Sequence, residues 1–337
     1  MYNGDALYTD MVVRAFALWR EAEKSWGQTI LFPTGALYIF PGDDAFAKKS
    51  LPVMSDRGIA VELLTPEEAA QRFPQIGFDD VRVAYFEPGA GVLRARASCE
   101  LVCDSVEREG GAYRQAHVRL GRIDAGRLST VALDDGSTLE GDAFVFACGP
   151  WLGHLFPDVI GDGIAATRQA VVYLGTPPGN ERFSWRLFPG WMDFGEPRRY
   201  GMAGSERRGL KIGEDTPGKA IDPTTLERVI SPEEIVRARD FAKRRFPMLA
   251  DQPVVETRIC QYESSPEGDF LVDVHPQASN VWLIGGGSGH GFKMGPALGE
   301  YVARLVLDGE KPHQRFTYAN FSDARVRIRG SARQAHS

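Results

Sequence analysis

Apolar residues recur at helical spacing in five stretches of the chain. The longest, residues 5–26, carries a single apolar stripe and predicts an amphipathic helix. Two shorter stretches begin with a capping box, in which a Ser or Thr precedes a glutamate by three positions. In both, proline occupies the first helical position. These are Thr65-Pro66-Glu67-Glu68 and Ser231-Pro232-Glu233-Glu234, which predict helices over residues 65–73 and 231–245. The remaining two helices are expected over residues 94–109 and 292–308.

Shorter runs of apolar and β-branched residues predict strands over residues 30–32, 36–40, 115–120, 130–133 and 143–147. Residues 167–213 are rich in aromatic and β-branched residues with Gly and Pro breaks, which predicts an antiparallel sheet. The tail after residue 324 is expected to be poorly ordered. Because α/β pieces alternate with β-rich pieces, we expect a mixed α/β fold with two domains, each assembled from non-contiguous segments.

The densest glycine loop follows a short apolar run at residues 281–284. Five glycines fall within seven positions, and a helical pattern starts near Phe292. A strand that passes through such a loop into a helix presents free N–H groups and a partial positive charge. His290 and Lys293 lie in this segment, where both can face one bound object. A tightly packed helix entry with two incidental polar residues would give the same pattern, but we favour a cofactor loop.

Composition narrows the class of protein. Apolar residues make up 43% of the chain and charged residues 25%, as in an ordinary globular protein. The net charge of -6 argues against nucleic-acid binding, because a phosphate-binding surface normally shows a basic excess or stripe. No apolar run is long enough to span a membrane, and the first residues show no secretory signal. The four cysteines lack metal-type spacing, so we expect no metal site and a reduced, cytoplasmic setting.

A nucleotide-binding fingerprint of the form GxGxxG/A occurs at residues 161–166. The chemistry of that fingerprint requires a strand before it and a helix after it. Here the preceding residues contain Pro157, and the following residues 168–174 have a strand pattern. We therefore interpret this match as coincidental.

Seven motifs in order along nearly the whole chain carry a resemblance to a known family. They are EPGAGVL (residues 87–93), ACGPW (147–151), RQ (168–169), YGM followed by GLKIG (200–213), ICQY (259–262), DFLVDVHP (269–276) and SGHGFKMGP (288–296). Together they resemble the FAD-dependent amine oxidases of the D-amino-acid-oxidase superfamily, and within it the sarcosine oxidase-like and N-methyltryptophan oxidase-like members. The resemblance implies a Rossmann-like FAD-binding domain (residues 1–30, 92–163 and 266–325) interleaved with an antiparallel-sheet substrate domain (31–91 and 164–265).

The resemblance also assigns residues to the cofactor. The loop that wraps the flavin ring and ribityl chain in this family, together with two backbone positions beside the cofactor, matches Gly287, Ser288, Gly289, His290, Gly291, Lys293, Gly149 and Leu120. Cys260 by itself has two interpretations, an inert buried thiol or a side chain that reaches a site. In the resemblance it matches the cysteine that carries FAD through an 8α-thioether.

Five residues match positions that serve the substrate or oxygen. Lys293 matches the lysine that pairs with the substrate carboxylate, and Tyr200 and Tyr262 match pocket tyrosines. Lys211 matches the lysine that promotes oxygen reduction, a role in which an ammonium stabilises developing superoxide charge. The pocket histidine of the family falls on Asp215, and a carboxylate there argues against sarcosine itself as the substrate.

One block of the family pattern has no counterpart in this sequence. Family members begin with a βαβ unit that carries GxGxxG, an acidic ribose-binding residue and an arginine for the substrate carboxylate, whereas Met1 falls after that block. We therefore expect an N-terminally incomplete FAD-binding domain, an interior sheet edge that lacks a partner, and weakened binding of the ADP half of FAD. A start site placed too far downstream is the favoured explanation, over a genuine truncation or a segment supplied by another chain.

The resulting hypothesis is an FAD-dependent oxidase of an amino acid or N-methyl amino acid. Hydride would pass from the substrate to the flavin, the imine would hydrolyse, and oxygen would be reduced to hydrogen peroxide. The expected partners are a small-molecule amine and oxygen, with no nucleic acid or membrane, and the expected state is a monomer. Two alternatives stay open: a dehydrogenase that uses a quinone or a protein as acceptor, and a non-catalytic remnant or interaction subunit.

Overall fold

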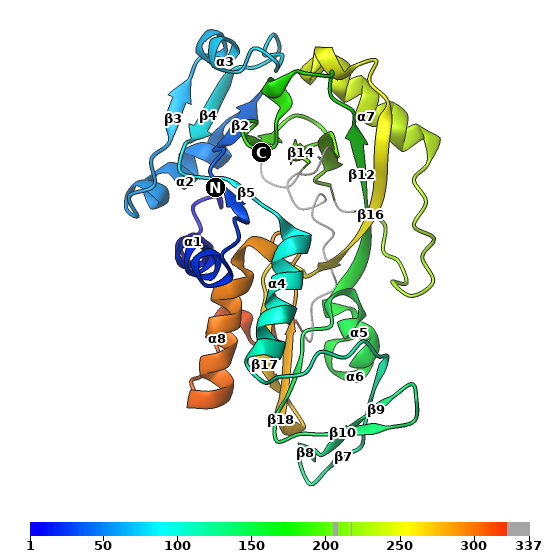
Figure 1. The fold of residues 1–337 in the computed structure, drawn as a ribbon. Helices are drawn as coiled ribbons and strands as arrows, with labels where there is room; N and C mark the ends of the chain where they lie inside the picture. The colour runs from blue at the N-terminus through cyan, green and yellow to red at the C-terminus, as the bar shows by residue number, and fades with distance from the viewer. Residues whose placement is uncertain (205–207, 217, 322–337) are drawn as a thin grey trace, which may run out of the picture. The chain divides into compact units, whose positions relative to one another are not determined.

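The protein is described by a computed structural model over residues 1–204, 208–216 and 218–321 (Figure 1). The chain forms two compact units. Unit 1 comprises residues 1–98, 169–216 and 227–260, and unit 2 comprises residues 99–168, 217–226 and those from 261 onward. The expected disordered tail after residue 324 lies outside the described residues.

Unit 1 is built around an eight-stranded sheet of order β16-β12-β15-β14-β13-β2-β4-β3. β13 and β2 pair in parallel, and the β12–β15, β15–β14, β14–β13, β2–β4 and β4–β3 pairs are antiparallel. The helices of the unit are α1 (Ala6–Trp26), α2 (Ala45–Ser55), α3 (Pro66–Arg72) and α7 (Pro232–Arg245). Its strands are β1 (Leu31–Phe32), β2 (Ala36–Phe40), β3 (Glu62–Leu64), β4 (Val83–Glu87), β5 (Val92–Leu93), β13 (Gly190–Asp193), β14 (Arg199–Ala203) and β15 (Leu210–Glu214), with most of β12 (Ala165–Leu174) and β16 (Val254–Ser264).

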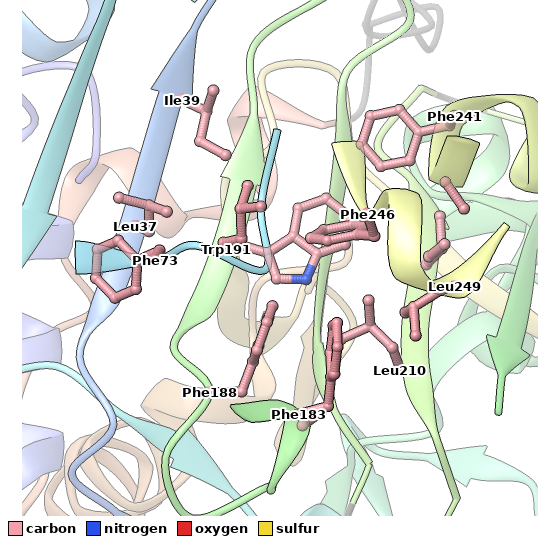
Figure 2. Packing of buried hydrophobic residues seen from close by; sticks show 14 of the residues in the cluster. Leu37, Ile39, Phe73, Phe183, Phe188, Trp191, Leu210, Phe241, Phe246 and Leu249 are labelled. Carbon is pink, nitrogen blue, oxygen red and sulfur yellow. The ribbon is translucent and has the colours of Figure 1, made fainter. Parts of the chain in front are cut away.

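One face of this sheet is buried in a large apolar core. Trp191 lies at the centre of an aromatic cluster, with ring centroids 5.6 Å from Phe241 and 5.0 Å from Phe246 (Figure 2). Phe241 comes from α7, whose apolar stripe covers the sheet. Alternate residues of a strand point to opposite faces, so the burial of Trp191 on this face turns its neighbour Met192 to the other.

Unit 2 contains a three-stranded sheet of order β11-β18-β17 in which β11 and β18 are parallel and β11 forms one edge. β18 and β17 pair antiparallel. The elements of this unit are α4 (Ala95–Arg108, which starts in unit 1), β6 (Val118–Leu120), β7 (Ile123–Asp124), β8 (Arg127–Leu128), β9 (Thr130–Leu133), β10 (Thr138–Glu140), β11 (Phe144–Phe146), α5 (Leu152–Leu155), α6 (Pro157–Ile160), β17 (Leu271–His275), β18 (Ala278–Gly285) and α8 (Gly295–Asp308).

The local sequence signals located most elements. Both predicted capping boxes form, at Thr65 and Ser231, and the antiparallel pairing expected within residues 167–213 is confirmed. The GxGxxG/A match at residues 161–166 is coincidental, because a 3₁₀ turn there leads directly into strand β12. The mixed α/β prediction is also confirmed.

Helix α2 was not predicted. Its N-cap Asp44 makes no capping hydrogen bond and Pro52 lies inside the helix, so both usual local signals are missing. Among the described residues, no helix combines the length and apolar character that a bilayer span requires.

Candidate functional site

In unit 1, the strand pairing places the predicted substrate residues on one face of the sheet. Tyr200 lies opposite Gly213, Met202 lies opposite Lys211, and Tyr173 lies opposite Lys211 on the other side. Directly opposed residues share a face. This face is the one turned away from the core around Trp191, because Met192 lies opposite Tyr200.

The Lys211 ammonium is half-buried on this face. Its Nζ lies 4.8 Å from the centroid of the Tyr200 ring, a distance suited to a cation–π contact. Burial lowers the pKa of Lys211, because a charge loses hydration there, and charge on Cys260 would oppose this shift. A desolvated cation beside an aromatic ring is suited to stabilise negative charge that develops nearby.

Asp215 directly follows β15 and forms an ion pair. Its carboxylate lies 3.5 Å from the guanidinium of Arg198, and its backbone N–H donates to the Arg198 carbonyl at 2.8 Å. The sequence indicated only a carboxylate in place of the histidine of the family. The structure adds that the Arg198 guanidinium pairs with this carboxylate.

Cys260 and Tyr262 lie two positions apart on strand β16, so they project to the same side of that strand. Cys260 belongs to unit 1 and is a half-buried free thiol. Strand β16 passes into unit 2 at Gln261, so Tyr262 belongs to unit 2. Its ring lies against the glycine loop.

In unit 2, the glycine loop begins at the carboxyl ends of the parallel pair β11 and β18. Ligands in sheets of this type bind outside the carboxyl ends of the strands. Gly289 has φ +78°, and a Cβ built on it would lie 2.2 Å from Cε2 of Tyr262. The loop can therefore follow this path under the Tyr262 ring only with glycine at position 289.

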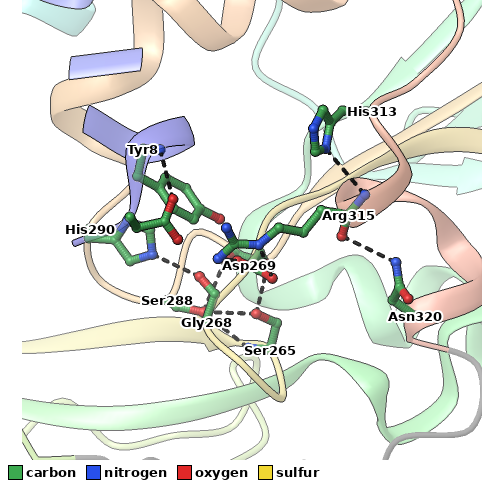
Figure 3. A network of polar contacts seen from close by, with 11 residues as sticks. Tyr8, Ser265, Gly268, Asp269, Ser288, His290, His313, Arg315 and Asn320 are labelled. Carbon is green, nitrogen blue, oxygen red and sulfur yellow. Dashed lines mark hydrogen bonds and ion pairs between the residues drawn. The ribbon is translucent and has the colours of Figure 1, made fainter. Parts of the chain in front are cut away.

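Polar contacts hold the loop in a defined conformation (Figure 3). Ser288, with φ +45°, accepts a hydrogen bond from the Ser265 N–H at 3.1 Å and donates to the Gly286 carbonyl at 3.0 Å. His290 donates from Nε2 to the Gly268 carbonyl at 2.8 Å and stacks on Phe270 with centroids 5.5 Å apart.

Asp269, next to the carbonyl that His290 contacts, is fixed in turn by Arg315. Nε and Nη2 of Arg315 each donate to the Asp269 carboxylate at 2.7 Å. Such a bidentate pair is stronger and more directional than a single contact. The glycine loop is therefore braced by the segment that follows α8.

The remaining predicted residues lie around the same unit. The exposed Lys293 donates from Nζ to the His290 carbonyl at 3.2 Å. Gly149, with φ +54°, opens the turn after β11. Leu120 ends β6 and is partly buried against the core of the unit.

Glu263, the residue after Tyr262, is a site residue that the sequence did not predict. Its Oε1 accepts a hydrogen bond from the Gly287 N–H at 3.1 Å, and its buried Oε2 has no hydrogen-bond partner among the described residues. The sequence offered one signal for this residue: a glutamate directly follows Tyr262 in a strand that carries other predicted site residues.

These residues fit a flavin nucleotide. In unit 2, the glycine loop at the carboxyl end of β18 exposes backbone without side chains and leads into α8. Beside this loop, the buried Oε2 of Glu263 has no hydrogen-bond partner among the described residues. In unit 1, the desolvated Lys211 lies beside Tyr200, and the Cys260 thiol on the edge strand β16 of the same sheet is near enough to affect the pKa of Lys211. Polar hydroxyl and carbonyl groups of the cofactor suit the first set, and its redox chemistry suits the second.

The chain is similar to several known proteins. The chain is 29% identical to monomeric sarcosine oxidase from Bacillus sp. (strain B-0618), with 93% of this chain and 80% of that protein covered. It is 27% identical to N-methyl-L-tryptophan oxidase from Salmonella arizonae, with 91% and 81% covered. The structure matches that of L-proline dehydrogenase from P. horikoshii with a TM-score of 0.82 at 20% identity, covering 94% of this chain and 84% of that one.

Residues 2–305 match the family described as FAD dependent oxidoreductase. That match spans unit 1 and reaches through β18 into α8 of unit 2. The chain therefore belongs to the FAD-dependent oxidoreductases of the D-amino-acid-oxidase (DAO) family.

Proposed function

We propose that this protein oxidises the C–N bond of an amino acid or an N-methyl amino acid and uses oxygen as the electron acceptor. The observation that carries the proposal is the desolvated Lys211 ammonium beside Tyr200. Relatives of this chain are named as sarcosine and N-methyltryptophan oxidases, which supports an amine next to a carboxylate as the substrate class.

The chemistry that FAD supplies when bound is acceptance of a hydride and delivery of two electrons to oxygen. The residues that would hold it are the loop residues Gly287 to Gly291, with Gly149 and the Leu120 backbone, and Cys260 would attach it covalently. The bracing of this loop by Ser265, Gly268 and Glu263 supports the assignment, because a preformed loop loses little entropy on binding.

The other residues act on substrate and oxygen. Lys293, whose ammonium is exposed, would bind the substrate carboxylate. Tyr200 and Tyr262 would shape the pocket, and Asp215 would contribute shape and hydrogen bonding more than net charge, because Arg198 pairs with it. Lys211 would stabilise negative charge as oxygen is reduced.

The test begins with the colour of the purified protein. Flavin absorbance that stays with the protein after acid precipitation supports a covalent link, and a Cys260→Ser variant should release its flavin under the same treatment. Peroxide formation is then measured with amino acids and N-methyl amino acids and compared with reduction of a dye acceptor under nitrogen. Fast dye reduction without peroxide would establish a dehydrogenase instead. A colourless protein that gains no flavin from added FAD would refute the proposal.

A further inference from the structure

Glu263, the penultimate residue of β16, holds its carboxyl group against the start of the glycine loop within unit 2. Its Oε1 accepts the Gly287 N–H, and its own backbone carbonyl accepts the Ser288 N–H at 3.0 Å. The carboxyl group fills the room that side chains on the loop would need. A Cβ on Gly287 would lie 2.8 Å from Oε1, and a Cβ on Gly285 would lie 3.2 Å from Oε2.

The surroundings of Oε2 are apolar. The Cβ position built on Gly285 lies 2.5 Å from Cδ2 of Leu152 and 3.3 Å from Cδ1 of Ile164. Oε2 therefore shares this small space with two aliphatic side chains. The oxygen is buried and has no hydrogen-bond partner among the described residues. Leaving a buried oxygen in that state is costly, and the cost is greatest when the carboxyl group is ionised.

The electrostatic surroundings shift the Glu263 carboxyl toward its protonated form. Burial raises the pKa of Glu263, and the amides of Gly287 and Gly286 oppose the shift only in part. From the elements packed around it, Cys148 after β11 is the titratable group that senses the carboxyl, whereas Leu152 of α5 and Ile164 before β12 are apolar. The pKa of Cys148 is raised by burial and further by charge on Glu263, so this thiol offers Glu263 no compensating cation.

We propose that Glu263 is a cofactor-binding residue whose carboxylic acid uses Oε1 to hold the Gly287 N–H and donates Oε2–H to an oxygen of the flavin nucleotide. This inference rests on the proposed flavin function and adds a residue and a proton requirement to it. A neutral donor suits a nucleotide with hydroxyl and phosphate oxygens, whereas a carboxylate at the same place would repel phosphate.

The first test uses a Cys260→Ser background, in which the proposed covalent link cannot form, and measures FAD affinity by quenching of flavin fluorescence between pH 6 and pH 9. Glu263→Gln keeps both hydrogen bonds, because the amide oxygen accepts from Gly287 and the amide nitrogen donates. We expect this variant to bind FAD as the wild type does at low pH and to keep that affinity as the pH rises. The protein with Glu263 intact should bind FAD more weakly as the pH rises. Glu263→Ala should bind about tenfold more weakly than Glu263→Gln at every pH, as expected for one lost hydrogen bond to a polar ligand.

The second test needs no cofactor. An acid whose pKa is raised in the folded state destabilises the fold as pH climbs from its unfolded value through its folded value, because the folded state then holds the extra proton. The Glu263→Gln protein should therefore gain thermal stability relative to the wild type as the pH increases. Glu267→Gln removes the same charge from an exposed position nearby and should show no such trend.

The outcomes separate the two proposals. If Glu263→Gln loses FAD as severely as Glu263→Ala while its apo-protein shows the expected stability trend, Glu263 acts as a charged acceptor and the inference is overturned. If wild-type FAD affinity does not change with pH, the donor role is likewise overturned. If the wild type binds no FAD at any pH although the stability trend is present, the proposed function itself fails, and the cofactor role of Glu263 with it.

Discussion

Replacing Gly289 with alanine tests the conformation of the glycine loop most directly. The added Cβ would lie 2.2 Å from Cε2 of Tyr262, which is 1.2 Å inside the 3.4 Å at which ordinary contact begins. The φ of +78° adds a second penalty, since an L-residue there costs about 1–2 kcal/mol. Displacement of a packed ring costs about 1–3 kcal/mol more. We expect Gly289→Ala to lose about 2–5 kcal/mol of unfolding free energy, as the two terms together imply.

The assay is urea unfolding of the apo-protein followed by circular dichroism, combined with a double-mutant cycle. In a Tyr262→Ala background the ring is gone, so Gly289→Ala should cost only the conformational penalty of about 1–2 kcal/mol. The coupling between the two positions is then about 1–3 kcal/mol. Gly299→Ala is the matched control, because no atom lies within 4 Å of its Cβ position in α8, and it should stabilise the protein by about 0.5–1 kcal/mol. Equal costs of Gly289→Ala in both backgrounds would refute the argument that Tyr262 dictates glycine at this position.

Three further predictions concern the rest of the molecule. Lys211→Met should slow flavin reoxidation by oxygen by about 10²–10³-fold in stopped-flow experiments, with little effect on anaerobic reduction by substrate, and equal losses in both would contradict the role of Lys211. Arg245→Met should cost about 3–5 kcal/mol in urea unfolding, because Arg245 is fully buried and its Nε lies 2.7 Å from the buried Asp193 carboxylate. Lys243→Met in the same helix breaks only an exposed pair and should change little. Hydrogen bonding to Arg208 lowers the pKa of Glu256 from 4.5 to about 2, so its ion pair stabilises the protein above pH 4.5 and is lost as pH falls toward 2. Glu256→Gln should remove that part of the acid dependence of the melting temperature, and an unchanged profile would count against it.

Local sequence signals predicted the elements that depend on local interactions. The capping boxes at Thr65 and Ser231 satisfy N–H groups within four residues of chain, so they could be identified without the fold. Helix α2 could not, because the carboxylate at its start makes no capping bond and instead contacts Tyr85 of β4 and Lys48 within the helix. Asp44 accepts from the Tyr85 hydroxyl at 2.7 Å and pairs with Lys48 at 2.9 Å, leaving no capping bond.

The candidate site likewise combines features visible in the sequence with features that only the fold creates. The motif around Lys211 was visible in the sequence, but its proximity to Tyr200 follows from the pairing of β14 with β15. Asp215 was visible as a carboxylate, whereas its compensation by Arg198 depends on the same pairing. Glu263 carried no motif, and its importance arises only where the loop from β18 returns against β16.

By itself, the sequence determined the glycine loop at residues 285–291, the helix and strand periods, and the order of motifs that identifies a flavin oxidoreductase. These features depend on backbone freedom and side-chain alternation along a short length of chain. The tertiary structure decided which charges are balanced, which polar atoms lose water, and why Gly289 must lie beneath Tyr262. Those properties depend on contacts between residues far apart in the chain, because burial and charge compensation are set by the neighbours that folding brings together.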